Sequence, residues 1–541
     1  MGGAWDVIVV GGGGGGLAAA VSAGRTGARV LLLEKAAHVG GTTALAIGSI
    51  AAAGTSMQRA AHVADSADLH FADVEAVVRG RPGQENVRLR RLLVVEAAAT
   101  VEWLHGLGVE FYGPNPWPGM SAPRMHNALP NARAYVEVLG RAARRLGVEI
   151  RTGARATALV TDESGTVIGV RIGGDPTAVG PESPGSGEIV LARAVVVATG
   201  YFHGDPDLRA RYLPPDAAPV DSIDPNQTGD GHRMTMALGA PMVNMGVGSA
   251  PEFRFVTRTD RLLARRLPVH PLATRAMRLG LRMLPRAVFL RVVKDLITGY
   301  TAPSPKLFAG GGILVNRDGT RFANELGDFT YAVARQPGKV GYLVFDDDVA
   351  RTFSAYPNVV STAPGIAYAY LTDYRQLRPD IYHVAPTVER AAVAAGLPPD
   401  AVAATVALWN RAIAEGAMDP FGRTDLGVGI RQPPFHVMGP AKSWFVDSQG
   451  GPAVDEQCRV LGGDGGPIRG LFAAGALSKA SLLYGGAGFD LAWVFTSGRI
   501  AGAAAAVAAR AGSTGSASRP SSTSHSHPSE PADARSGGQR R

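Results

Sequence analysis

The stretch Asp6-Val-Ile-Val-Val-Gly-Gly-Gly-Gly-Gly-Gly16 joins a short apolar run directly to six consecutive glycines. Val7 to Val10 predicts a buried strand, and the alanine-rich segment Leu17 to Arg25 after the glycines predicts a helix. A second apolar run, Val30 to Leu33, ends in the acid Glu34. Strand, glycine loop, helix, strand and acid in this order are typical of a βαβ unit that binds a dinucleotide.

Three of the glycines occupy the positions that such a unit requires. Gly11 permits the tight turn after the strand, Gly13 lets backbone approach a pyrophosphate, and Gly16 lets the helix pack closely on the strand. The helix N-terminus adds N–H donors and a positive dipole for the phosphates. Glu34 is placed to take the ribose hydroxyls.

Further glycine turns favour FAD over NAD as the cofactor. Val39-Gly-Gly-Thr-Thr43 follows the acid and suits a chain that folds back along an extended dinucleotide. Ala194 to Gly200 and Gly470 to Gly475 are each a buried strand that runs into a turn of small residues, as needed where backbone passes a flat ligand. A nicotinamide domain would need only the first unit.

Composition places the chain among ordinary globular proteins. It has 541 residues, 46% of them hydrophobic and 18% charged, which is enough for two sizeable domains. The single cysteine, Cys458, excludes internal disulfides and cysteine-based metal clusters, and we predict no metal site. No lysine or arginine precedes Arg25, and no run of 18 apolar residues occurs, so we expect neither a signal peptide nor a membrane span. A cytoplasmic location is the resulting expectation.

The motifs divide the chain into four segments. Residues 1–238 and 437–511 carry the glycine turns and predict a cofactor domain built from two separate parts. Residues 239–436 predict a second domain inserted between them. Residues 512–541 hold no large apolar residue and are rich in Ser, Pro and Gly, which predicts a disordered tail.

Basic residues concentrate in one segment, 254–294. It holds ten arginines and one lysine against Asp260 alone, more than the net charge of +8 of the whole chain. Arg275, Arg278 and their neighbours recur at helical spacing. A solvated helical surface is one interpretation, and peripheral contact with anionic lipid is the other. We do not expect nucleic acid binding, because no recognised module accompanies these arginines.

Motifs along almost the whole chain resemble the fumarate reductase/succinate dehydrogenase flavoprotein superfamily, and most closely its 3-ketosteroid dehydrogenase branch. The resemblance implies an α/β fold, with a Rossmann-type FAD-binding domain, an inserted α+β capping (substrate) domain and the active site between them. The segments that carry it, besides the N-terminal unit, are Gly40 to Thr43, Val195 to Gly200, Thr228 to Gly231, Gly312 to Glu325, Gly470 to Gly475, Tyr484 to Gly488 and Gly498 to Gly502.

The cofactor site implied by the family is a noncovalent one. Relatives with covalent FAD use a histidine after the second glycine turn, and residues 40–50 contain none. The acid that usually follows the Ala-Ala-Gly turn is replaced by Ala476. The residues expected to bind FAD are Gly11, Gly13, Gly16, Glu34, Lys35, Gly41, Thr42, Thr43, Ala156, Thr199, Gly200, Asp230, Gly475, Gly488 and Leu491.

Departures from the family pattern bear on the substrate. Dicarboxylate-reducing members place an arginine where this chain has Phe329, and a carboxylate-gripping histidine where it has Asp447. Another arginine of those members is replaced here by Leu483 or Tyr484. Of the arginines and histidines that bind fumarate in the family, only one histidine has an equivalent in this chain, and that residue is His126. Without those cations a dianion would lose its hydration uncompensated, so fumarate and succinate are not the expected substrates.

The resemblance implies catalytic roles for a few polar groups. The Tyr484 hydroxyl and the Gly488 N–H would hold a substrate carbonyl and stabilise the enolate formed when the adjacent carbon loses a proton. For the base, Tyr331 lies two residues beyond the family position, Tyr112 is a second tyrosine, and His126 could relay a proton.

The leading hypothesis is therefore an FAD-dependent oxidoreductase that acts on CH–CH bonds and desaturates an apolar cyclic ketone next to its carbonyl. The same site run backwards is an ene-reductase of an enone or quinonoid ring in secondary metabolism. A catalytically inactive flavin-binding protein is the third alternative. The sequence assigns neither the direction of the reaction nor the electron acceptor or donor.

Overall fold

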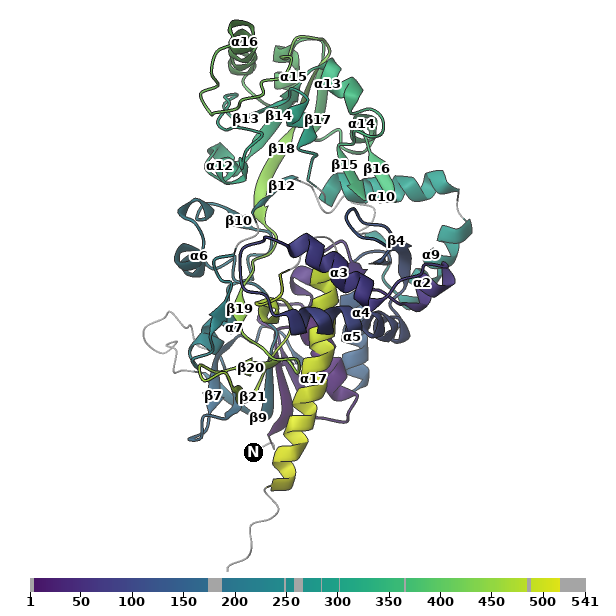
Figure 1. Ribbon diagram of the computed structural model, residues 1–541, viewed down its shortest axis with the longest axis vertical. Coiled ribbons are helices and arrows are strands. Elements are labelled where there is room, and N and C mark those ends of the chain that lie inside the picture. The colour runs from purple at the N-terminus through teal and green to yellow at the C-terminus, as the bar shows by residue number, and fades with distance from the viewer. Residues whose placement is uncertain are drawn as a thin grey trace, which may run out of the picture.

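The computed structural model describes residues 4–173, 187–247, 250–256, 266–283, 285–300, 302–363, 366–483 and 488–515. Figure 1 shows two lobes, a lower one that contains the long helix α17 (Phe489–Gly515) and an upper one from which β18 (Phe435–Phe445) runs down toward the lower lobe. The lower lobe holds both the N-terminal βαβ unit and the last helix. Segments from opposite ends of the chain therefore form one domain.

A mainly parallel sheet is the centre of the lower lobe. Its strands follow the order β20–β21–β9–β1–β2–β6. β1 (Trp5–Val10) pairs in parallel with β2 (Val30–Leu33) on one side and with β9 (Glu188–Val197) on the other. The sheet is completed by β6 (Glu149–Arg151), β7 (Ala156–Thr161), β8 (Val167–Ile172), β20 (Arg459–Leu461) and β21 (Pro467–Ala473). Both strands of the predicted βαβ unit are confirmed, and their all-apolar sequences fit a sheet that is buried on both faces.

Two helices of small residues cover this sheet in direct contact with each other. Every residue of α1 (Gly14–Gly24) is buried, and α17 packs along it. A Cβ on Gly502 would lie 2.1 Å from the carbonyl oxygen of Ala19, and one on Gly498 would lie 2.4 Å from that of Gly15. The two helices therefore touch backbone to backbone, which explains the glycines of the Gly498 to Gly502 segment.

The apolar character of α17 has a structural cause. Among the described residues, its stretch Phe489–Ala511 is the one helix long and apolar enough to cross a membrane. Most of that stretch is nevertheless buried inside the protein, against α1, β9 and the neighbouring elements. Burial in the domain core thus accounts for its composition without a membrane.

The remaining helices and strands of the lower lobe surround the central sheet. The helices are α2 (Ser56–Ala60), α3 (Ala67–Val78), α4 (Val87–Leu107), α5 (Arg133–Arg145), α6 (Pro206–Tyr212) and α7 (Asp230–Met236). Two small sheets are formed by β3 (Ser49–Ala51), β4 (Phe111–Asn115) and β5 (Met125–Ala128), and by β11 (Met242–Val243) and β19 (Gly451–Pro452).

The upper lobe is an α+β domain around a second sheet, as expected for a cap. Its strands are β10 (Asp221–Ser222), β12 (Glu252–Phe255), β13 (Ile313–Val315), β14 (Gly341–Phe345), β17 (Tyr382–Ala385) and β18, and a separate hairpin is formed by β15 (Ser361–Ala363) and β16 (Ala367–Ala369). The helices are α9 (Pro271–Met283), α10 (Arg286–Tyr300), α11 (Lys306–Ala309), α12 (Thr330–Ala334), α13 (Asp347–Thr352), α14 (Leu371–Leu377), α15 (Val388–Ala394) and α16 (Pro399–Glu415).

The limits of this second sheet differ from the predicted limits 239–436. β10 comes before residue 239, and most of β18 comes after residue 436. A two-residue strand such as β10 has no sequence signal of its own, and Gly439 and Pro440 inside β18 interrupt the residue pattern of a strand. At the C-terminus α17 continues to Gly515, and the rest of the predicted tail lies outside the described residues.

Buried ion pairs hold the segment Gly312 to Glu325 within the cap. Arg423 Nη1 lies 3.1 Å from Glu325 Oε2, and neither side chain is exposed. Arg321 donates to the same carboxylate at 2.8 Å and to Asp419 at 2.6 Å. Glu325 of the family's Asn-Glu pair therefore has a structural role in this chain, as the anchor of two arginines.

Candidate functional site

The glycine loop before α1 is shaped by close backbone contacts. Gly11 has a φ of +103°, and a Cβ there would lie 2.5 Å from the Ala198 carbonyl oxygen. A Cβ on Gly16 would lie 1.8 Å from the Gly11 carbonyl oxygen. Gly13, by contrast, has open space where its Cβ would be. The loop is thus tight on its inner side and leaves room beside Gly13 for a ligand, as the dinucleotide interpretation requires.

A cavity of about 460 Å³ opens in front of this loop and is lined by segments from across the sequence. It lies along the carboxyl ends of β1, β2 and β9, where open parallel sheets bind their ligands. Of the predicted cofactor residues, those in the cavity wall are Gly11, Gly13, Glu34, Lys35, Gly41, Thr42, Thr43, Ala156, Thr199, Gly200, Asp230, Gly475 and Leu491. Gly16 and Gly488 are not in the wall, and Gly16 acts through the packing just described.

Glu34 marks one end of the cavity. The N–H groups of Gly12 and Ala36 donate to its two carboxylate oxygens at 2.7 and 2.8 Å. The side chain is buried at the wall of the cavity, at the end of β2. This is the position of an acid that binds ribose hydroxyls, so this end suits the adenosine half of a dinucleotide.

The predicted residues Lys35 and Asp230 meet each other at this adenosine end. Lys35 Nζ lies 2.8 Å from one Asp230 oxygen, and Arg155 Nη2 lies 2.8 Å from the other. Burial alone would raise the pKa of Asp230, but the two cations outweigh it and lower that pKa. Asp230 therefore stays ionised and fixes both basic side chains beside the cavity.

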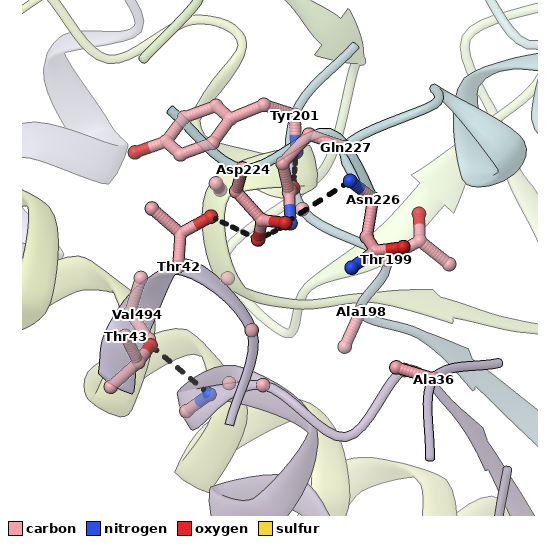
Figure 2. A pocket seen from close by; sticks show the side chains of 18 of the residues that line it. Ala36, Thr42, Thr43, Ala198, Thr199, Tyr201, Asp224, Asn226, Gln227 and Val494 are labelled. Carbon is pink, nitrogen blue, oxygen red and sulfur yellow. Dashed lines mark hydrogen bonds between the residues drawn. The ribbon is translucent and has the colours of Figure 1, made fainter. Parts of the chain in front are cut away.

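The opposite end of the cavity is built from the second glycine turn, the loop after β9 and the start of α17. Figure 2 shows Thr42, whose hydroxyl donates to Asp224 at 3.1 Å, and Gln227, which also donates to Asp224 and accepts from the Tyr201 N–H. The Gly14 N–H donates to the Thr43 hydroxyl at 3.2 Å. These contacts fix the turn against the cofactor loop, so this end is preformed for the flavin half.

Four polar side chains that the sequence analysis did not combine meet at the flavin end. Lys479 Nζ, on a side chain only 2% exposed, lies 2.9 Å from Asp490 and 3.4 Å from Asp447. It also lies 4.9 Å from the centre of the Tyr201 ring, and the Tyr201 hydroxyl donates to Asp490 at 3.3 Å. We call Asp447, Lys479, Asp490 and Tyr201 the lysine cluster. Its two carboxylates and its tyrosine line the cavity.

The lysine cluster defines the protonation of its tyrosine. Burial and then the Asp490 carboxylate raise the pKa of Tyr201 well above its ordinary value. Tyr201 therefore remains a neutral hydrogen-bond donor at any physiological pH. The groups at this end that can accept a proton are the carboxylates.

The predicted catalytic residues are distributed over several places. Tyr484 lies outside the described residues. Gly488 has a φ of +92° at the N-terminus of α17, and its carbonyl accepts from the Ala51 N–H at 3.0 Å. Tyr112 contacts Phe289 of α10, with ring centres 5.0 Å apart, at the junction of the two lobes.

His126 and Tyr331 are each engaged away from the cavity wall. The His126 ring is fully buried, with one nitrogen 2.9 Å from the Thr55 hydroxyl and the other 2.7 Å from the Arg124 carbonyl. Burial lowers the pKa of His126 to about 4. Tyr331 packs beside Phe202 and Phe445, where burial raises its pKa. Their catalytic assignments stay predictions, and a raised phenol pKa makes a weaker acid, not a better base at neutral pH.

Phe329 occupies the place of the family's arginine or tyrosine as part of an apolar cluster. Its ring is edge-on to Phe253 and Phe308, with centres 5.2 and 5.3 Å away. This position is therefore part of the core of the cap and carries no proton donor.

Cys458 is fully buried and does not line the cavity. Burial raises the pKa of its thiol, so the reactive thiolate is suppressed. This environment suits the noncovalent cofactor that the sequence predicts.

We expect the purified protein to be yellow and to release all its flavin on acid precipitation. The released flavin is measured by absorbance of the supernatant, with a riboflavin-free expression culture as the control for background colour. Flavin that remains with the washed pellet would contradict noncovalent binding.

Comparison with known proteins agrees with the geometry. The family described as "FAD binding domain" matches residues 6–252 and 301–488. A probable fumarate reductase, Ifc3, of Shewanella frigidimarina is 26% identical over 92% of this chain and 74% of its own. The 4-oxocyclohexanecarboxylate 2-dehydrogenase of Sinomonas cyclohexanicum is 27% identical over 93% of each chain.

A solved structure shows the same fold. The open conformation of a flavocytochrome c3 fumarate reductase is 25% identical and superposes with a TM-score of 0.69, covering 94% of this chain and 79% of that one. The cradle at Gly13, the buried Glu34 and the long cavity fit FAD. The chain belongs to the FAD-dependent fumarate reductase/succinate dehydrogenase flavoprotein superfamily and is an oxidoreductase of CH–CH bonds.

Proposed function

We propose that this enzyme desaturates an apolar cyclic ketone, of the 3-ketosteroid kind, next to its carbonyl group. The observation that carries the proposal is the charge at the flavin end of the cavity. Asp447 and Asp490 line it, and Lys479, which lies there, is already bound to both carboxylates. Glu252, also in the cavity wall, is paired with Arg254. A dicarboxylate would meet like charges at this place, whereas a neutral ketone would not.

The cap supports the same conclusion. Phe329 contributes to an aromatic cluster where dicarboxylate-reducing relatives place an arginine. The relative from Sinomonas cyclohexanicum, whose name specifies a cyclic ketone with one carboxylate, matches this chain along almost its whole length. The shared superfamily therefore does not by itself favour fumarate over a ring ketone.

Residues of this chain supply the proton chemistry of the proposed reaction. Asp447 is a carboxylate at the flavin end and is better placed than Tyr331 or His126 to take the proton from the carbon beside the carbonyl. Lys479, 3.4 Å away, holds that carboxylate in place. By resemblance, Tyr484 and the Gly488 N–H stabilise the resulting enolate. When bound, FAD would supply the acceptor for the hydride of the next carbon, which leaves a C=C bond between the two carbons.

The proposal is tested by mixing the purified yellow protein anaerobically with androstenedione-type 3-ketosteroids and smaller cyclohexanones. We expect the flavin absorbance to bleach with at least one ketone and turnover to continue when an artificial acceptor is added. A panel that leaves the flavin oxidised throughout would contradict desaturation.

Fumarate should not be reduced by the viologen-reduced enzyme, even at millimolar concentration, because the flavin end offers carboxylates to a dianion. Oxidation of the viologen is followed by its absorbance, and a genuine fumarate reductase under the same conditions is the control. Fumarate-dependent oxidation would overturn the assigned substrate class.

The alternative is the reverse reaction, reduction of an enone or quinonoid ring. It is favoured by the relative named a probable fumarate reductase, because that protein's name describes a reductase. Enones that reoxidise the dithionite-reduced flavin, together with ketones that fail to bleach it, would select this direction. A protein that is silent in both directions would be the flavin-binding protein without catalysis.

We also propose that the enzyme is cytoplasmic and that it exchanges electrons with an acceptor or donor whose identity is not assigned. Neither depends on the residues of the cavity. Fractionation of the source cells, with the flavoprotein followed by antibody, tests the location.

A further inference from the structure

A stripe of apolar side chains on α9 faces solvent. Leu272, Leu279 and Met283 are 68%, 60% and 78% exposed, and Ala276 between them is exposed as well. Positions 272, 276, 279 and 283 follow the spacing of one helix face. Scattered single leucines are ordinary on protein surfaces, but an aligned row of them marks an interaction site.

The opposite face of α9 fixes its orientation on the protein. Thr274 is 2% exposed, and Arg278 donates to Glu110 at 2.8 Å. Glu110 lies next to β4 in the lower lobe, whereas α10 packs on the β15–β16 hairpin of the cap. Since the inner face is held in this way, the apolar stripe points outward at the edge of the molecule, where Figure 1 shows α9.

Positive charge surrounds the stripe. Arg275 on the same helix is 67% exposed at its side chain and shares the single carboxylate of Glu110 with Arg278, so one positive charge of this pair is left over. Arg291 on α10 is exposed too. Val288, at the start of α10, extends the exposed apolar surface. The whole segment 254–294 carries ten arginines and one lysine against a single aspartate. An apolar row flanked by arginines is the composition of helices that lie in the interface of anionic membranes.

We propose that α9 and the start of α10 form a surface that binds an anionic lipid bilayer, with the α9 stripe inserted among the acyl chains and the arginines at the lipid phosphates. Charge decides between this partner and a second copy of the chain. Two copies joined through this face would bring two sets of arginines together, whereas anionic lipid neutralises them. The inference is independent of the proposed substrate.

The test is cosedimentation of the flavin-loaded protein with vesicles of phosphatidylcholine and phosphatidylglycerol, compared with vesicles of phosphatidylcholine alone. We expect binding to the anionic vesicles that weakens at high salt, because the electrostatic part is screened. Leu279→Glu should weaken the apparent affinity roughly tenfold or more, since one inserted leucine is lost and a charge is added. Arg291→Gln should give a smaller loss that disappears at high salt.

The matched control is Leu408→Glu on α16, because Leu408 is 62% exposed and lies in the cap away from α9. That variant should bind vesicles as the unchanged protein does. Flavin absorbance and thermal unfolding establish that each variant is folded. Wild-type protein that stays in the supernatant with anionic vesicles would overturn the proposal, as would Leu279→Glu protein that binds undiminished. A wild-type dimer in solution that Leu279→Glu converts to a monomer would assign the face to self-association instead.

Discussion

Replacing Lys479 with methionine will lower the free energy of unfolding by about 3 kcal/mol and weaken the retention of FAD. The lysine is almost fully buried and lies between Asp447 and Asp490. Methionine keeps the volume of the stem but leaves two carboxylates without the cation beside them. These carboxylates are partly exposed, so the expected loss is at the lower end of the range for breaking a buried pair.

The same change acts on the cofactor through charge. FAD carries a negative pyrophosphate, and removal of the Lys479 charge beside two carboxylates makes the potential in the cavity more negative. Thermal unfolding followed by flavin fluorescence and by circular dichroism measures both effects. Arg351→Met is the control, because Arg351 is 67% exposed beside Asp347 and Asp348 and its loss should cost below about 1 kcal/mol. Equal stability of the Lys479 and Arg351 variants would show that the lysine cluster does not stabilise the site.

Tyr484→Phe should reduce turnover on the true substrate by a factor on the order of 10²–10³, because one of two oxyanion donors is lost while the ring is kept. Loss of such a donor typically costs about 2.7–4 kcal/mol in the chemical step. The KM and the flavin content should change much less, since the hydroxyl acts on charge that develops in the transition state. Stopped-flow bleaching of the flavin by the ketone measures the step directly.

Tyr331→Phe provides the comparison for that result. Tyr331 packs in an apolar cluster near Phe202, so its variant should keep full activity. A loss as large as that of Tyr484→Phe would identify Tyr331 as the base despite its distance from the family position. Near-normal turnover of the Tyr484→Phe variant would contradict the oxyanion role of Tyr484. The chain would then share only its fold with ketosteroid dehydrogenases.

The parts of the site that the sequence predicted are those encoded by neighbouring residues. Gly16 is required by its backbone contact with Gly11 within one turn, and Glu34 ends the strand that follows, so a single short segment carries this information. Lys35 and Asp230 were both assigned to the cofactor, but their ion pair was not foreseen, because it depends on how β2 and α7 meet in space.

The lysine cluster could not be predicted, because its members come from three distant segments. From the sequence, Asp447 indicates only that the family's histidine is replaced. Lys479 lies among small residues and matches no motif. The two side chains meet only because the β18–β19 connection contacts the turn before α17. The same holds for Arg278, whose partner Glu110 lies far away in the sequence.

The glycine contacts between α1 and α17 have a consequence for biosynthesis. The cavity wall includes Gly475, Leu491 and Val494 beside Gly14 and Gly15, and these three residues are synthesised long after the N-terminal unit. A nascent chain that has only its N-terminal βαβ unit therefore has half a binding site and cannot retain the cofactor. Flavin capture therefore requires the α17 segment as well as the N-terminal unit, and the yellow colour of a preparation reports that α1 and α17 have packed together.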